Sequence, residues 1–150
     1  MVIHFICRGN VFRSLIAEAY VRSLQIPNLT VHSSGTVAGR DKEKNLINFP
    51  KILGVLKDYG VGKYAKEDYG DDINQELLDK SDIIVFLNRR AYDEARQHFV
   101  LPNKILIWDV ADIDDVGRPP ENDIELRAFI EAAYDEITKN VDNLRKLEQF

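Results

Sequence analysis

Residues 2–20 read VIHFICRGNVFRSLIAEAY and place a strand, a loop and a helix in one short segment. Val2–Ile6 is a run rich in apolar and β-branched residues, which predicts a strand buried on both faces. Ser14 precedes an apolar pattern of helical period that continues to Leu24. A strand that passes through a short loop into a helix is typical of an α/β layer fold.

Three further runs of the same composition predict the remaining strands, and the segments between them are long enough for crossover helices. We therefore expect an α/β fold with a four-stranded parallel sheet of order 2-1-3-4 and helices on both faces, a flavodoxin-like three-layer sandwich. The three runs are Leu29–His32, Ile83–Leu87 and Ile105–Trp108. The later helices are expected from Pro50 to Gly60, Gln75 to Asp79, Tyr92 to Phe99, and along an apolar stripe from Leu126 to Leu144.

Composition fits a single domain over residues 1–150, with 45% apolar and 30% charged side chains. The net charge of −5 argues against a nucleic-acid partner. No apolar run is long enough to span a membrane and the first residues do not resemble a signal peptide, so we expect a cytoplasmic protein without a membrane role. The single cysteine excludes an internal disulfide and a cysteine-based metal cluster.

Three segments look irregular: Val37–Asn45, Val61–Asp72 and Ala111–Asn122. In an open α/β sheet, ligands bind beyond the carboxyl ends of the strands. The first and third segments follow directly on the second and fourth predicted strands. We expect these two loops to select the substrate.

The loop after the first strand has the spacing Cys-x5-Arg-Ser. Its backbone N–H groups can turn inward at the positive end of the helix dipole and cradle a tetrahedral anion, with Gly9 easing the turn. A thiol at the opening of such a cradle lies where negative charge is favoured, which predicts Cys7 as a nucleophile. Arg13 can donate two parallel hydrogen bonds to phosphate oxygens, and Ser14 can donate to the sulfur.

A lone cysteine at the end of a buried strand is more often inert packing than a catalyst. Here the arginine and the hydroxyl residue at fixed spacing favour the catalytic interpretation over that one. His4, His32 and His98 share no metal-ligand spacing, and His4 inside a strand is expected to be a hydrogen-bonded core residue. We expect no metal and no cofactor.

The loop resembles the phosphate loop of the low-molecular-weight protein tyrosine phosphatases, with the pattern Cys-x-Gly-Asn-x-Cys-Arg-Ser-Pro. His32-Ser-Ser-Gly-Thr36 is similar to the end of the family's second strand, which implies that Ser33 supports Asn10. Trp108-Asp-Val-Ala-Asp112 is similar to the stretch that leads into the family's general acid. This resemblance assigns that role to Asp112, with Asp109 as the alternative, followed by Asp114 and Asp115.

The resemblance implies hydrolysis of phosphomonoesters through a phosphocysteine, with a phosphorylated protein or a small aryl phosphate as substrate and inorganic phosphate as product. The residues implied at the substrate are Arg8, Gly9, Asn10, Val11, Phe12 and Ser14, beside the catalytic Cys7, Arg13 and Asp112. The physiological substrate stays open between phosphotyrosine, phosphoarginine and a small ester.

The chain also departs from the family pattern. Phe12 replaces the second loop cysteine, Leu15 replaces the following proline, and Ile113 replaces the proline after the acid. The family's aromatic substrate walls have no clear counterpart. Two other functions therefore stay open: arsenate reduction on the same fold, which in the thioredoxin-coupled reductases uses further cysteines, and a non-catalytic module that binds phosphate or phosphoproteins.

Overall fold

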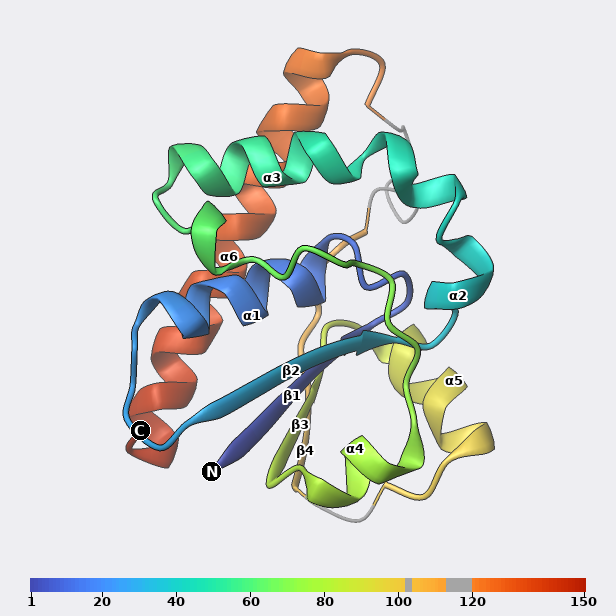
Figure 1. The fold of residues 1–150 in the computed structure, drawn as a ribbon, viewed down its shortest axis with the longest axis vertical. Coiled ribbons are helices and arrows are strands. Elements are labelled where there is room, and N and C mark those ends of the chain that lie inside the picture. The colour runs from blue at the N-terminus through green and yellow to red at the C-terminus, as the bar shows by residue number, and fades with distance from the viewer. Residues whose placement is uncertain (102–103, 113–119) are drawn as a thin grey trace.

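The computed structural model describes residues 1–101, 104–112 and 120–150 (Figure 1). One parallel sheet has the order β2-β1-β3-β4, which confirms the predicted order 2-1-3-4. Its strands are β1 (Val2–Cys7), β2 (Thr30–Gly35), β3 (Ile83–Phe86) and β4 (Lys104–Ile107). The helices are α1 (Arg13–Ser23), α2 (Ala38–Asp41), α3 (Phe49–Asp58), α4 (Gln75–Lys80), α5 (Arg89–His98) and α6 (Asp123–Glu148), with 3-10 turns η1 (Lys44–Ile47) and η2 (Gly62–Tyr64).

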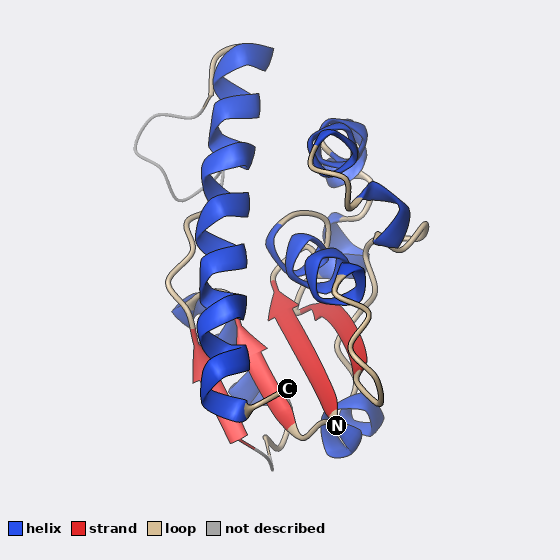
Figure 2. Cartoon of the chain, turned by 90° about the vertical axis from the view of Figure 1, so that its left-hand side faces the viewer, coloured by secondary structure: helices blue, strands red, loops and turns tan. Residues whose placement is uncertain are grey.

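The side chains of β1 alternate between two apolar cores, one on each face of the sheet. Ile3, Phe5 and Cys7 belong to the larger core, together with buried residues of α1, α3 and α6. Ile6 belongs to the smaller core, which α4 and α5 cover. Figures 1 and 2 show the same division, with α6 running along one side of the sheet. The predicted three-layer arrangement is confirmed.

The bounds of β1, β3 and β4 differ from the predicted runs by one residue at one or both ends, and two larger differences concern β2 and the burial of β4. β2 continues to Gly35, because Ser33 and Ser34 pair with β1 although their side chains are polar. β4 was expected to be buried on both faces and is only partly covered, since it forms an edge of the sheet. A continuous apolar run therefore does not distinguish an edge strand from a central one.

Side-chain caps set the starts of the later helices. α5 begins at Arg89 and not at Tyr92, because Asn88 Oδ1 accepts a hydrogen bond of 3.0 Å from Ala91 N–H. Asn122 caps α6 in the same way, accepting from Glu125 N–H at 2.9 Å. In both helices the sequence signal for the helix start is the asparagine, which accepts from the N–H three residues later.

Two of the segments expected to be irregular contain short helices. Val37–Asn45 includes α2 and the start of η1, and Val61–Asp72 includes η2. The second segment then reaches the carboxyl end of β2, where Asp72 forms a parallel β-bridge with Gly35. Within the part of the chain that is described, no helix is both long and apolar enough to span a bilayer.

Candidate active site

The loop between β1 and α1 is held at both its entrance and its centre. Thr36 N–H donates to Cys7 O at 3.1 Å, and Val37 N–H donates to Arg8 O at 2.9 Å, so the chain after β2 fixes the start of the loop. At the centre, Asn10 has a φ of 52°, in the left-handed region that a residue with a side chain rarely adopts. Contacts around Asn10 must therefore hold its backbone in this conformation.

Cys7 lies at the end of β1 and is only 2% exposed. Asn10 N–H donates to Cys7 Sγ at 3.2 Å, and Ser14 Oγ lies 3.0 Å from the same sulfur. Asn10 Nδ2 donates to Ser14 Oγ at 2.9 Å, which leaves the serine O–H available to donate to the sulfur. The sulfur therefore lies within hydrogen-bonding distance of the loop backbone and of the first turn of α1.

Arg13 is 1% exposed and is among the residues that line the pocket at the loop. Its Nη1 donates to Val110 O at 2.9 Å, and its Nη2 lies 3.4 Å from Asp112 Oδ2. Its Nε is buried and has no hydrogen-bond partner among the described residues. A buried N–H without an acceptor costs free energy, so this atom is suited to an oxygen of a bound anion.

Asp112 reaches Arg13 because the chain after β4 continues to pair with the end of β3. Trp108 N–H donates to Phe86 O at 2.8 Å and Val110 N–H donates to Leu87 O at 2.9 Å. The Asp112 side chain is 24% exposed and lines the pocket above Cys7. Asp109 is exposed and is not among the described residues that line it, and Asp114 and Asp115 lie outside the described residues.

The pocket at the loop has a volume of about 80 Å³. Of the residues predicted at the site, Cys7, Arg8, Gly9, Val11, Phe12, Arg13 and Asp112 line it. The facing side, which we call the outer wall, consists of Asp41, Lys44, Asn45 and Asn48 from α2, η1 and the turn into α3. The outer wall is polar, whereas Phe12 and Ile52 add apolar side chains to the pocket lining.

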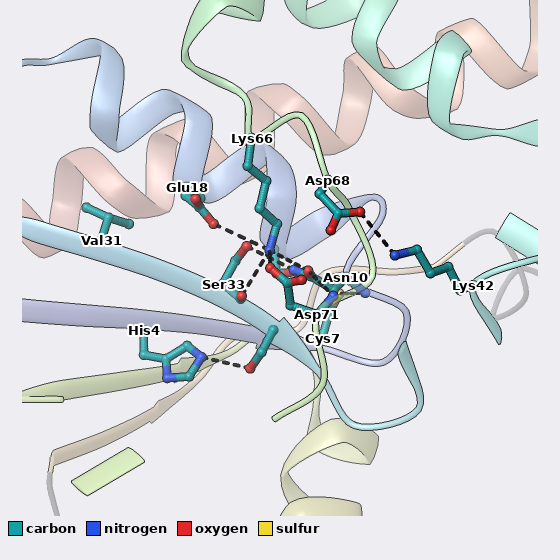
Figure 3. A network of polar contacts seen from close by, with 12 residues as sticks. His4, Cys7, Asn10, Glu18, Val31, Ser33, Lys42, Lys66, Asp68 and Asp71 are labelled. Atoms are coloured by element: carbon teal, nitrogen blue, oxygen red, sulfur yellow. Dashed lines mark hydrogen bonds and ion pairs between the residues drawn. The ribbon is translucent and has the colours of Figure 1, made fainter. Parts of the chain in front are cut away.

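Three further residues predicted at the site have buried side chains that do not line the pocket: Asn10 in the loop, Ser14 on α1 and Ser33 on β2. Asn10 Nδ2 donates to both serine hydroxyls, at 2.9 Å each. Lys66 joins them through a 2.5 Å hydrogen bond from its Nζ to Asn10 Oδ1 (Figure 3). We call these four residues the floor. Asn10 and Ser14 were expected to touch substrate; the structure directs their side chains into this network, and neither residue is among those that line the pocket.

Arg8 is oriented by a helix on the far side of the sheet. Its Nε donates to Glu94 Oε1 at 2.6 Å, and Glu94 Oε2 accepts from Thr36 Oγ1 at 3.1 Å. Because α5 carries Glu94, this ion pair connects the loop to the smaller core face. Arg8 also lines the pocket.

The histidines lie away from the pocket. His4 is fully buried, and His4 Nε2 lies 2.7 Å from Ser34 Oγ, as expected for a hydrogen-bonded core residue. Burial lowers the pKa of His4 to about 3, with smaller effects from the nearby charges of His32 and Lys66. Burial also lowers the pKa of His32. In the described residues, no group of three or more His, Cys, Asp or Glu is arranged to hold a metal ion.

The segment that contacts Asn10 from outside the loop, Lys66 to Asp71, was not among the predicted site residues. Lys66 Nζ and Asp71 N–H both donate to Asn10 Oδ1, and Gly70 N–H donates to Asn10 O at 3.1 Å. Most of the outer wall comes from Val37–Asn45, a segment expected to select the substrate, but none of its individual residues was predicted at the site. Gly70, with a φ of 82°, is the one local signal of a defined turn in a stretch dominated by charges.

A family model described as low molecular weight phosphotyrosine protein phosphatase matches residues 2–148. A protein of Halalkalibacterium halodurans named arsenate reductase is 31% identical over 145 residues, covering 93% of this chain and 91% of its own length.

Among solved structures, an arginine phosphatase from Drosophila is 17% identical with a TM-score of 0.75, covering 100% of this chain and 99% of its own. The arginine phosphatase YwlE of Bacillus subtilis, in a variant with a phosphorylated active-site serine, is 18% identical with a TM-score of 0.70, covering 97% of both chains. These two structures share the fold.

Proposed function

Because the chain belongs to the low molecular weight phosphotyrosine protein phosphatase family, we propose that it hydrolyses phosphomonoesters through a phosphocysteine on Cys7. Residues 1–150 would act as one catalytic domain. A catalytic thiolate needs a reducing compartment, so the proposal places the protein in the cytoplasm. The substrate is a phosphorylated protein or a small aryl phosphate.

The first step transfers the phosphoryl group to sulfur. Cys7 Sγ attacks phosphorus, an S–P bond forms and the P–O bond to the leaving group breaks. Asp112 in its acid form gives its proton to the departing oxygen. Arg13 and the loop N–H groups hold the equatorial oxygens, where charge accumulates in the transition state.

The second step returns the enzyme to its starting state. Asp112, now a carboxylate, takes a proton from water as the water oxygen attacks phosphorus. The S–P bond breaks, inorganic phosphate leaves, and Ser14 donates to the departing sulfur of Cys7. No metal or cofactor takes part in either step.

One observation carries this proposal: the buried Nε of Arg13 has no acceptor among the described residues, in a pocket that Cys7 and Asp112 also line. An oxyanion above the loop supplies the missing acceptor and a target for the sulfur. The phosphorylated active-site serine reported for the arginine phosphatase YwlE supports a covalent intermediate at the corresponding place in the fold.

The test is hydrolysis of an aryl phosphate, followed as released phenol and released inorganic phosphate. Cys7→Ser should abolish turnover and still bind inorganic phosphate, because the backbone cradle persists while the hydroxyl is a much weaker nucleophile. Arg13→Lys should also be severely impaired, since an ammonium cannot donate two in-plane hydrogen bonds. Near wild-type turnover by Cys7→Ser would exclude the phosphocysteine; phosphate binding without turnover by the wild type would favour the binding module.

Arsenate reduction is the second candidate, favoured by the relative named arsenate reductase. Arsenate is tetrahedral and fits the same loop. Reduction of As(V) to As(III) takes two electrons, which two thiols provide as they form a disulfide. This chain holds one cysteine, so an external thiol such as thioredoxin or glutathione must supply the second sulfur. Thiol-dependent arsenite formation without aryl phosphate hydrolysis would favour this function.

A further inference from the structure

We propose that Lys66 is a positioning residue that holds Asn10, and through it the phosphate loop, in the conformation that binds the oxyanion. This inference deepens the proposed function and rests on it. Lys66 is not placed to touch substrate. Its ammonium contacts Asn10 (Figure 3), and Lys66 is not among the residues that line the pocket.

The Lys66 ammonium is directed by three acceptors. Its Nζ lies 2.5 Å from Asn10 Oδ1, 3.1 Å from Ser33 O and 2.9 Å from Asp71 Oδ2. An ammonium has three N–H donors, so these contacts use all of them. The side chain is only 14% exposed. A lysine held in this way has lost the freedom that a surface lysine keeps, which points to a defined role for its position.

Asn10 needs this support because of its left-handed backbone, with a φ of 52°. Its Nδ2 hydrogens go to Ser14 and Ser33, and its Oδ1 accepts from Lys66 Nζ and from Asp71 N–H at 3.0 Å. The four contacts fix the amide in one orientation. Removing the shortest of them weakens the constraint on the backbone that carries the Asn10 N–H.

The same asparagine connects Lys66 to the nucleophile. Asn10 N–H donates to Cys7 Sγ, and Asn10 Nδ2 holds Ser14 Oγ, which lies 3.0 Å from that sulfur. A shift of Asn10 therefore changes both groups that contact Sγ. Misplacement by about 1 Å of groups around a reacting centre can cost on the order of 10²-fold in rate.

Buried charge explains why a cation occupies this position. Glu18 on α1 is 3% exposed, with Oε1 paired to Arg22 at 2.8 Å. Its Oε2 lies 4.0 Å from Lys66 Nζ and has no hydrogen bond among the described residues. The ammonium thus lies between the Glu18 and Asp71 carboxylates and keeps a buried charge compensated, as a neutral donor could not.

The experiment compares Lys66→Met, Lys66→Arg and the control Lys42→Met. Lys42 belongs to the same region and is ion-paired to Asp68 at 3.0 Å, but no described contact joins its side chain to the loop (Figure 3). For Lys66→Met we expect inorganic phosphate affinity and kcat on an aryl phosphate each to fall about tenfold to a hundredfold. Lys66→Arg should recover part of both losses, and Lys42→Met should match the wild type.

A third measurement needs no ligand: hydrogen exchange of the Asn10 amide, followed by NMR below the unfolding temperature. It should accelerate in Lys66→Met and not in Lys42→Met. A lower unfolding temperature with unchanged phosphate affinity, kcat and Asn10 exchange would overturn the inference and leave Lys66 a purely structural residue. If the wild type fails to hydrolyse any phosphate ester, the proposed function fails, while phosphate affinity and Asn10 exchange still decide the role of Lys66.

Discussion

The floor and the outer wall bound the same loop but are built in opposite ways. The floor residues lie beneath the loop and contact one another across α1, β2 and the segment before α4. The outer wall is partly to fully exposed and sits on α2, η1 and the turn into α3, all close together in the chain. From this difference we predict that substitutions in the floor disturb the loop, and that substitutions in the outer wall have little effect on it.

Asp112 belongs to neither region but lines the pocket beside Arg13, and its replacement should have the largest effect. Asp112→Asn should slow hydrolysis of a phenyl or alkyl phosphate by about 10²–10⁴-fold, the usual scale for a positioned proton donor. Esters of strongly acidic phenols should lose much less, because their leaving groups are stable as anions. The measurement is the burst of released phenol across a series of leaving groups.

Asp109→Asn is the matched control, with the same charge three residues earlier and an exposed side chain. It should show no dependence on the leaving group. If Asp109→Asn shows that dependence and Asp112→Asn does not, the acid has been misassigned by those three residues. If neither does, Asp114 and Asp115 become the candidates.

The rigidity of the floor side can be tested at Gly35, the end of β2. A Cβ at this position would lie 2.4 Å from Arg8 O and 2.9 Å from Asn10 N, both backbone atoms of the loop. Gly35→Ala should therefore lower the free energy of unfolding by about 3 kcal/mol and displace the loop. Urea unfolding and phosphate affinity should both decline. Normal affinity in the folded variant would show that the loop tolerates movement from below.

Acid should destabilise the β1–β2 contact next to the floor through His4. Its pKa is about 3 in the folded protein and 6.5 as the reference value, so the unfolded chain binds more protons between these pH values. Stability is unaffected by this group above pH 6.5 and falls as the pH decreases toward 3. At pH 5 the loss is roughly 2 kcal/mol.

Urea unfolding at pH 7 and pH 5 measures this loss. His4→Leu should be less stable at pH 7, because Ser34 loses its partner, but should show a weaker pH dependence. His32→Gln should remove a smaller part of that dependence, since His32 is only partly buried. An unchanged slope in His4→Leu would assign the acid sensitivity to other groups.

Sequence patterns predicted the fold well because its signals are local. The β1 run and the helical stripe of α6 each lie within one element, and the Cys-x5-Arg-Ser spacing joins the end of β1 to the start of α1. The extent of β2 was not predictable from hydrophobicity, because Ser33 and Ser34 are buried through pairing and side-chain hydrogen bonds and not through apolar surface.

Site residues were predicted where the motif is contiguous, and at Ser33 and Asp112 through the family resemblance. The sequence placed Cys7 and Arg13 in one loop, and the structure puts Asp112 beside Arg13. Lys66 was not predictable, because its contacts to Asn10 and Glu18 join residues 56 and 48 positions apart. A lysine in a charged, irregular segment resembles any solvated lysine until the fold brings it beneath the loop.

The smallest expected effect tests whether the outer wall is as adaptable as the comparison implies. A Cβ on Gly9 would lie 2.6 Å from Asn45 Nδ2, which is nearly as close as the 2.4 Å approach at Gly35. The atom it meets is the end of a side chain that can rotate away, and not a backbone atom. Gly9 needs no left-handed backbone, so Gly9→Ala carries no added strain and keeps its N–H. We expect Gly9→Ala to change the free energy of unfolding by less than about 1 kcal/mol and KM for an aryl phosphate only a few-fold.

Gly9→Ala combined with Asn45→Ala should return KM toward that of Asn45→Ala alone, because the overlap is gone. If Gly9→Ala is as damaging as Gly35→Ala and Asn45→Ala does not relieve it, the outer wall is as rigidly coupled to the loop as the floor, and substrate choice cannot vary independently of the reaction.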